Sequence, residues 1–210
     1  MTDPLNNALL DVRRAYRLLA DYQQRMFELL GYIRDRLGAK DYHQAYVHSL
    51  PQSVAGLENR TASGLRYLPF YDLSVIWLRC PQNQADKPHT HLKGDLMFGA
   101  WVRSDTGYNK YTGQFSDTPV VATESELLIS VVICDVPAPG NWYWNVWSAI
   151  SYPADGEVND KDKPGYRCFA KAVPLAQLAD KVAIDSALHR WCLEASQKLD
   201  AEITLHPVHS

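Results

Sequence analysis

Two histidines one residue apart form the best local candidate for a reactive site. His89 and His91 flank Thr90, and Asp95 follows four residues after His91. Side chains two residues apart on an extended strand project from the same side, so we expect both imidazoles to face one ligand. Such a pair can share a metal ion or move protons as acid and base, with Asp95 in support. This arrangement suggests a small hydrolase acting on a phosphoester or nucleotide.

The histidine pair does not make a complete site by itself. A metal centre needs three or four ligands and supporting groups. The other candidate ligands are scattered along the chain, at Asp72, Asp135, His43 and His48. His89-Thr90-His91 also resembles one half of the paired His-x-Thr arrangement of two-histidine phosphoesterases, but the second half is missing. The metal and any cofactor are therefore unassigned, and a plain loop-to-strand boundary after the polar residues 81–88 is the alternative.

Other catalytic patterns are missing from the sequence. It contains no glycine-rich phosphate loop, dinucleotide fingerprint or serine nucleophile elbow. Acidic residues at predicted strand ends are not accompanied by the carboxylate-x-lysine strand of restriction-type nucleases. The four cysteines, at positions 80, 134, 168 and 192, lie far apart, which predicts buried reduced thiols rather than disulfides or a zinc site.

The densest aromatic stretch spans residues 141–147. Its alternation predicts a strand over Trp142–Ile150, with Trp142 and Trp144 on one face and Tyr143 and Trp147 on the other. If one face belongs to the core, the other offers a contact surface, because Trp and Tyr are enriched at interface hot spots. A sheet buried on both faces is the alternative.

Residues 4 to 37 are predicted to form one uninterrupted helix. Asp3 and Pro4 suit its start and Gly38 suits its end. Its apolar positions alternate steps of three and four, with the polar Gln23 among them: Leu5, Leu9, Val12, Tyr16, Leu19, Met26, Leu30, Ile33 and Leu37. A helix of about 50 Å must cross or leave a domain whose radius of gyration is about 17 Å.

This helix makes association the leading hypothesis. The residues expected to contact a partner are Tyr16, Leu19, Gln23, Met26 and Leu30 of the helix, together with Trp142, Trp144 and Trp147. Packing of the helix on the chain's own sheet is the alternative. The opposite face carries six arginines interleaved with four acidic residues, and the net charge of −3 disfavours nucleic acid as the main partner.

The middle of the chain has a period of two, typical of a mainly antiparallel sheet with meander connections. Strands are predicted at Ala45–His48, Leu73–Leu78, Leu96–Arg103, Tyr108–Thr112, Leu127–Val136, Trp142–Ile150 and Arg167–Ala172. The polar stretch Pro153–Gly165 is predicted to be an exposed loop. After it, Pro174 is expected to open a short helix and Asp185 to cap a second one.

These elements predict an α+β fold with a long N-terminal helix, a central antiparallel sheet and two short C-terminal helices on one face. The expected parts are residues 1–38, 39–173 and 174–210, in one compact domain, with helix plus β core as a two-domain alternative. The start of the chain lacks the pattern of a signal peptide, and no run reaches 18 apolar residues, so we expect a cytosolic protein without a membrane partner. The function predicted is therefore an interaction protein or accessory subunit, with the hydrolase as the alternative.

Overall fold

The computed structural model describes residues 4–46, 72–80, 89–109 and 114–207. A long helix α1 (Pro4–Arg36) is followed by a six-stranded antiparallel sheet, and the chain ends in helix α4 (Lys181–Leu199). The predicted α+β fold is confirmed. Among the described helices, none is long and apolar enough to cross a membrane.

The sheet has the strand order β1-β2-β4-β7-β10-β9. Its strands are β1 (Lys40–Tyr46), β2 (Asp72–Arg79), β4 (Leu96–Arg103), β7 (Glu126–Cys134), β9 (Glu157–Asn159) and β10 (Tyr166–Pro174). The first five strands in spatial order also occur in this order along the chain, as in a meander, and β9, which precedes β10 in the chain, pairs with the outer edge of β10. Two small ribbons pair β3 (Thr90–His91) with β8 (Ala138–Pro139) and β5 (Tyr108–Asn109) with β6 (Gln114–Phe115).

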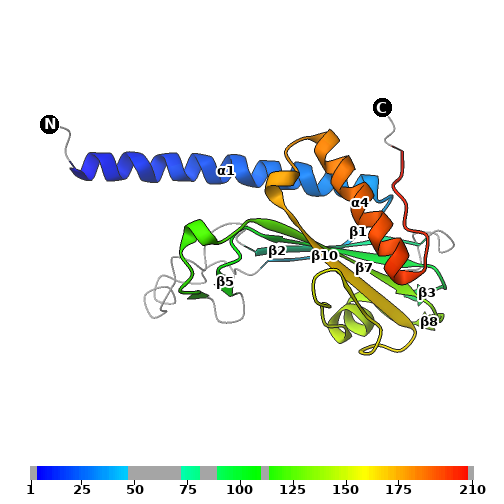
Figure 1. Ribbon diagram of the computed structural model, residues 1–210. Helices are drawn as coiled ribbons and strands as arrows, with labels where there is room; N and C mark the ends of the chain where they lie inside the picture. Colours follow the sequence, from blue (N-terminus) through cyan, green and yellow to red (C-terminus); the bar gives the residue numbers. More distant parts are fainter. Residues whose placement is uncertain (1–3, 47–71, 81–88, 110–113, 208–210) are drawn as a thin grey trace.

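Both faces of the sheet are covered. On one face, a large core joins the C-terminal half of α1, the sheet and α4, and includes Leu30, Phe98 and Trp191. A smaller core on the other face includes Met97, Val132 and Trp142. Figure 1 shows α1 and α4 above the sheet and the segment after β8 below it. Burial on both faces explains why β4 and β7 are almost continuously apolar.

The segment that covers the second face corrects the predicted strand at Trp142–Ile150. Its residues form a π-helical turn η2 (Trp142–Val146) and a 3-10 turn η3 (Trp147–Ala149). The Asn141 side chain caps this turn by accepting hydrogen bonds from the Tyr143 and Trp144 amides at 2.9 and 3.0 Å. Gly99 of β4 makes room for it, since a Cβ there would lie 2.8 Å from the Trp147 ring.

The C-terminal part also differs from the prediction. Instead of two short helices there is a single turn η4 (Leu175–Gln177) and the long helix α4. Asp180 caps α4 through the Ala183 amide at 2.9 Å, while the predicted cap, Asp185, lies inside the helix. Two further elements differ from the prediction. Strand β1 begins at Lys40 rather than at Ala45, and the predicted loop Pro153–Gly165 contains β9. Residues 47 and 48 of the first predicted strand and 110–112 of another lie outside the described residues.

Candidate interaction surface

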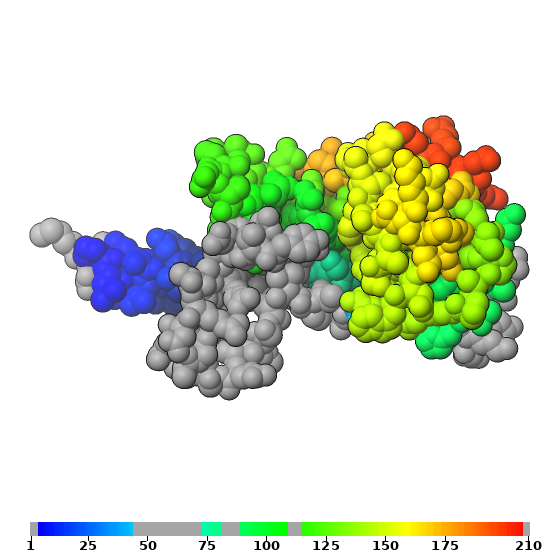
Figure 2. Space-filling view, turned by 90° about the horizontal axis from the view of Figure 1, so that it is seen from below, coloured from blue at the N-terminus to red at the C-terminus, as the bar shows by residue number. Residues whose placement is uncertain are grey.

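Helix α1 consists of two halves with different surroundings. Every residue from Pro4 to Leu18 is exposed, whereas Met26, Leu29, Leu30 and Ile33 are buried. Figure 1 shows the N-terminal half projecting past the end of the sheet, and Figure 2 shows the same from below. The helix is therefore anchored at one end and stands clear of the described body at the other.

The projecting half carries an apolar stripe on its surface. Its members are Leu5, Leu9, Val12 and Tyr16, with exposed fractions of 63, 46, 49 and 71%. Residues spaced by three and four lie on one side of a helix, so these four side chains form a continuous strip. We call it the exposed stripe. Water-exposed apolar strips of this kind mark interaction sites in soluble proteins.

The anchored half is fixed by polar contacts as well as by the core. The Arg25 guanidinium donates to the carbonyls of Leu178 and Ala179 at 3.1 and 2.8 Å. Asp185 of α4 accepts from Arg36 at 2.7 Å and from the Tyr32 hydroxyl at 3.0 Å. The side chain that was expected to cap a helix thus ties α4 to α1. These bonds hold the projecting half at a defined angle to the body.

The five helix residues predicted to meet a partner divide between the two halves. Tyr16 belongs to the exposed stripe, while Leu19 and Gln23 are half-buried at the edge of the body. Met26 and Leu30 are buried in the chain's own core and are not available to a partner. The intrachain alternative thus holds for the second half of the helix, and the first half stays exposed.

The stripe members Leu5, Leu9 and Val12 were left out of the predicted contact residues. Their spacing places them on the same line as Tyr16, so the signal was present in the sequence. What the sequence did not show is the point at which the body begins to cover the helix. The structure places that point near Tyr22, whose hydroxyl lies 2.8 Å from the Ser104 hydroxyl in the turn after β4.

The predicted aromatic contact residues also differ among themselves. Trp142 is fully buried, Trp147 is partly buried, and Trp144 is 71% exposed. Trp144 packs edge-on against Tyr143 at 4.8 Å between ring centroids, and Tyr143 lies 4.1 Å from the His43 ring of β1. The aromatic surface therefore lies on the helical turn η2 and the adjoining edge of the sheet rather than on a sheet face.

The three predicted reactive residues differ in their exposure to solvent. His89 is exposed, whereas His91 and Asp95 have exposed fractions of 0 and 1%. His91 stacks on the Trp142 ring at 4.0 Å, and its Nδ1 lies 2.6 Å from the Tyr166 hydroxyl. Asp95 accepts a hydrogen bond from the Leu92 amide at 2.8 Å. His91 and Asp95 therefore hold the turn before β4 against the second core.

The titration of this cluster matches its burial. Desolvation is the main cause of the lowered pKa of His91, and the nearby His89 and Lys163 lower this pKa further. A hydrogen bond with the Gly140 backbone acts in the opposite direction. Burial raises the pKa of Cys134 to about 11 and also raises that of Tyr166. These shifts favour the neutral forms of the Cys134 thiol and the His91 imidazole.

The described residues around His91 offer no metal-binding cluster. In the described part of the chain, no three His, Cys, Asp or Glu side chains are arranged to hold a metal ion. His91 Nε2 is buried and has no hydrogen-bond partner among the described residues.

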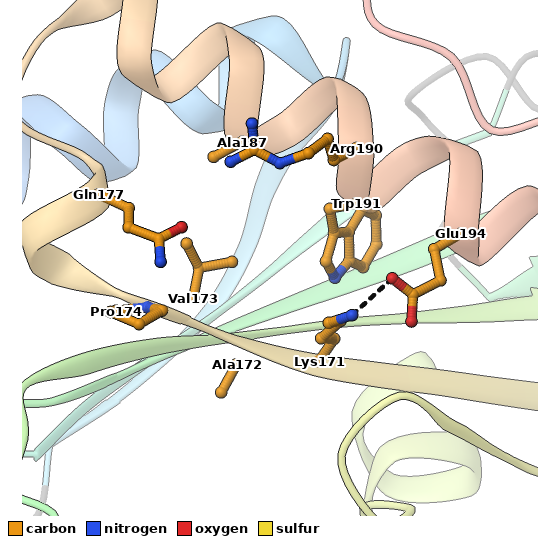
Figure 3. Close-up of a pocket in the computed structure, with 9 residues that line it drawn as sticks. All are labelled: Lys171, Ala172, Val173, Pro174, Gln177, Ala187, Arg190, Trp191 and Glu194. Atoms are coloured by element: carbon orange, nitrogen blue, oxygen red, sulfur yellow. Dashed lines mark hydrogen bonds and ion pairs between the residues drawn. The ribbon is translucent and has the colours of Figure 1, made fainter.

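A shallow pocket of about 310 Å³ lies between β10 and α4 (Figure 3). The ion pair between Lys171 and Glu194, at 2.6 Å, closes one side of it, and Arg190 lies at its rim. Trp191 lines the pocket, but its indole nitrogen is covered and has no hydrogen-bond partner within the described residues. The pocket lining combines apolar side chains with the amide of Gln177 and the charged groups of Lys171, Arg190 and Glu194.

Comparisons with known proteins place this chain beside one family. Residues 2–200 match the model of the family described as PM0109. The chain is 34% identical over 207 residues to "Uncharacterized protein PM0109" of Pasteurella multocida (strain Pm70), an alignment that covers 95% of this chain and 98% of that protein. No solved structure matches the chain.

Proposed function

Because the chain belongs to the PM0109 family over a match that includes both halves of α1 and all of α4, we propose one function for the whole chain: an interaction protein or accessory subunit that self-associates or docks into a larger assembly. The contact is made by the projecting half of α1. The body holds this half in position, and the aromatic surface around Trp144 offers a second contact.

The exposed stripe is the observation that carries this proposal. Helices in water gain most of their stability from packing of an amphipathic face, and short isolated helices are marginal. The stripe side chains of α1 are 46–71% exposed, although the same helix is well packed from Met26 onward. A partner that covers the stripe would supply the missing burial, so we infer that the projecting half works in a complex.

The energetics favour a reversible complex. Burying a large apolar side chain fully stabilises by roughly 1.5–3 kcal/mol, and roughly half of each stripe side chain remains exposed. Four such side chains from one helix would contribute about 3–7 kcal/mol. Association costs an estimated 4–15 kcal/mol in lost freedom of motion, so burial of the stripe on both sides of a contact is needed.

The proposed setting is a reducing compartment, as in the cytosol. The four cysteines are free thiols, and three of them are buried. A hydrolase centred on His89, His91 and Asp95 remains an untested prediction, and the burial of two of these three residues gives it no specific support. We assign no cofactor, and a nucleic-acid partner finds little support in a net charge of −3.

Light scattering at several concentrations tests the proposal. Deletion of residues 1–18 removes only the exposed half of α1, so the shortened chain should unfold at the same temperature as the full chain. The full chain is expected as an oligomer, or as part of a larger complex in a cell extract. The deletion should convert it to a monomer in both settings. A full chain that is monomeric in both settings would overturn the function.

A further inference from the structure

The pocket between β10 and α4 exists because β9 is short. Strand β9 pairs with β10 only from Cys168 to Ala170, so the outer edge of β10 has no strand partner among the described residues from Lys171 onward. Helix α4 passes over this uncovered edge, and the turn η4 lies at the far end (Figure 3). The volume of about 310 Å³ is at the lower end of the range for small-molecule sites. The end of β9 therefore leaves room for a small ligand.

Trp191 brings an unused hydrogen-bond donor to this pocket. Its side chain is 2% exposed, and its ring packs against Phe98 and Phe169 at 6.4 and 5.7 Å between ring centroids. The indole Nε1 is buried without a hydrogen-bond partner among the described residues, and Figure 3 shows it on the edge of the ring that faces β10. An indole nitrogen donates and does not accept. Because buried donors in native proteins are nearly always paired, this one calls for an acceptor that the described chain does not supply.

The other polar groups of the lining also favour an acceptor. Arg190 is exposed at the rim and forms no hydrogen bond or ion pair with the described residues, and the side-chain amide of Gln177 is likewise unpaired in this part of the chain. Glu194 is already paired with Lys171 at 2.6 Å. Two cations thus stand against one carboxylate in the lining. A ligand meets one uncompensated positive charge and three donor groups: the Arg190 guanidinium, the Gln177 amide and the Trp191 indole.

We propose that this pocket binds a small organic carboxylate with an apolar body, a role that goes beyond the function above and does not depend on the exposed stripe. A guanidinium pairs with a carboxylate through two parallel hydrogen bonds, so Arg190 holds the charged end. Figure 3 shows its guanidinium extending from α4 toward the η4 side, where Gln177 lies. The apolar body lies on Val173, Ala187 and the Trp191 ring, which are 8, 4 and 2% exposed. The indole N–H donates to a ligand oxygen.

The wall beside the indole is able to move. It is formed by the Lys171–Glu194 ion pair, whose side chains are 37 and 33% exposed. Surface ion pairs of this kind contribute little to stability, so a small shift of the pair admits an oxygen to the Trp191 Nε1 at low cost. The new hydrogen bond offsets that cost by pairing a donor that is otherwise buried unpaired.

Inorganic phosphate fits this pocket less well than a carboxylate. A phosphate group carries about 1.5–2 negative charges at neutral pH, against one uncompensated cation in the lining. It would also leave the apolar floor uncovered. The single charge and the apolar floor together select an organic monocarboxylate.

The indole N–H of Trp191 is a direct reporter of this site. Its signal is identified by resonance assignment in a proton–nitrogen correlation spectrum of the full chain, which is then titrated with phenylpropanoate. The signal should shift in a saturable way, with a dissociation constant on the order of 1 mM, as expected for so small a ligand. Phenylpropanamide has the same shape without the charge and should bind roughly tenfold more weakly.

Two variants with the same change of charge separate a local site from general attraction. Arg190→Gln removes the proposed carboxylate partner and should weaken the binding of phenylpropanoate roughly tenfold or more. Lys198→Gln is the matched control, because Lys198 lies on the same helix outside the pocket lining and pairs with Glu157 at 3.5 Å. It should leave the dissociation constant within about twofold.

Three results would overturn the carboxylate site: a Trp191 signal unmoved at about 20 mM phenylpropanoate, equal shifts with the acid and the amide, or equal dissociation constants for Arg190→Gln and Lys198→Gln. A supported site has two sources of ligand, a free small acid or the C-terminus of another protein. An acetylated tripeptide that ends in phenylalanine carries the same carboxylate and ring. Binding of the tripeptide at least tenfold tighter than phenylpropanoate assigns the site to a chain end, and equal or weaker binding assigns it to a free acid.

Discussion

Leu9→Ala should weaken self-association about thirtyfold, whereas Leu18→Ala should leave it nearly unchanged. Leu9 lies in the exposed stripe and is 46% exposed, while Leu18 is 70% exposed and lies on the opposite side of the same helix. Both changes replace Leu with Ala within the projecting half. Their effects on helix propensity are therefore matched.

The magnitude follows from the exposed part of Leu9. The change removes three carbon atoms, worth about 0.8 kcal/mol each on full burial, and about half of that burial is still to be gained on association. The loss is about 1 kcal/mol per chain and about 2 kcal/mol per dimer, which corresponds to a roughly thirtyfold larger dissociation constant.

Sedimentation or light scattering over a dilution series measures that constant, and thermal unfolding of each variant serves as the control for folding. Both variants should unfold within a degree or two of the parent, because neither side chain belongs to the core. Equal dissociation constants for the two variants would refute the assignment of the contact to the exposed stripe. A fall in unfolding temperature for Leu9→Ala alone would instead place Leu9 in an intrachain core.

Three further predictions concern the body. Leu30→Ala should lower the free energy of unfolding by about 2–5 kcal/mol in urea titrations, because its side chain is buried in the main core; a change below about 1 kcal/mol would contradict that placement. The pKa of His91 is lowered by burial, so the unfolded chain binds the extra proton more readily, and stability should fall as the pH drops below about 6.5. Urea unfolding at about pH 7.5 and 5.5 should show a smaller loss for His91→Phe than for the parent, and an equal loss would rule out His91 as the source. Gly38→Ala should destabilise by about 1–3 kcal/mol in thermal unfolding, since Gly38 has a φ of +61° and its Cβ would meet the His206 ring; an unchanged transition would show that the tail can move aside.

Periodicity was sufficient for much of the fold. The spacing of apolar residues predicted α1 almost to the residue, and Leu96–Arg103 coincides with β4. Gly38 has the positive φ that was expected at the end of the first helix. These elements succeed because local propensity and tertiary packing favour the same conformation.

The aromatic segment shows where periodicity fails. Alternating rings in 142–147 fit a strand, but Asn141 offers its side-chain oxygen to the next two amides and starts a helical turn. Helix caps are a sequence signal that alternation conceals in so short a segment. In the same way Asp180, rather than Asp185, begins α4, because only Asp180 precedes the first residue of the apolar pattern that packs on the sheet.

The candidate sites depended on tertiary information that spacing does not contain. His89 and His91 were expected to face one ligand, yet β3 is only two residues long and His91 turns into the second core beside Trp142. Likewise, one continuous stripe on α1 gave no indication that its second half would be buried by the chain's own sheet. Where a stripe becomes a core is decided by the position of the body, which the helix sequence does not encode.

The anchored and projecting halves of α1 together form a lever. From Tyr22 to Pro4 the arm is about 27 Å long at 1.5 Å per residue, so a tilt of about 10° at its base displaces the tip sideways by about 5 Å. A sideways displacement of that size is about half of the roughly 8–10 Å that separates the axes of two packed helices, enough to part the tip from a helix bound there. Core residues such as Ile33, and the Arg36–Asp185 ion pair, would thus set the orientation of the projecting half without taking part in its contact.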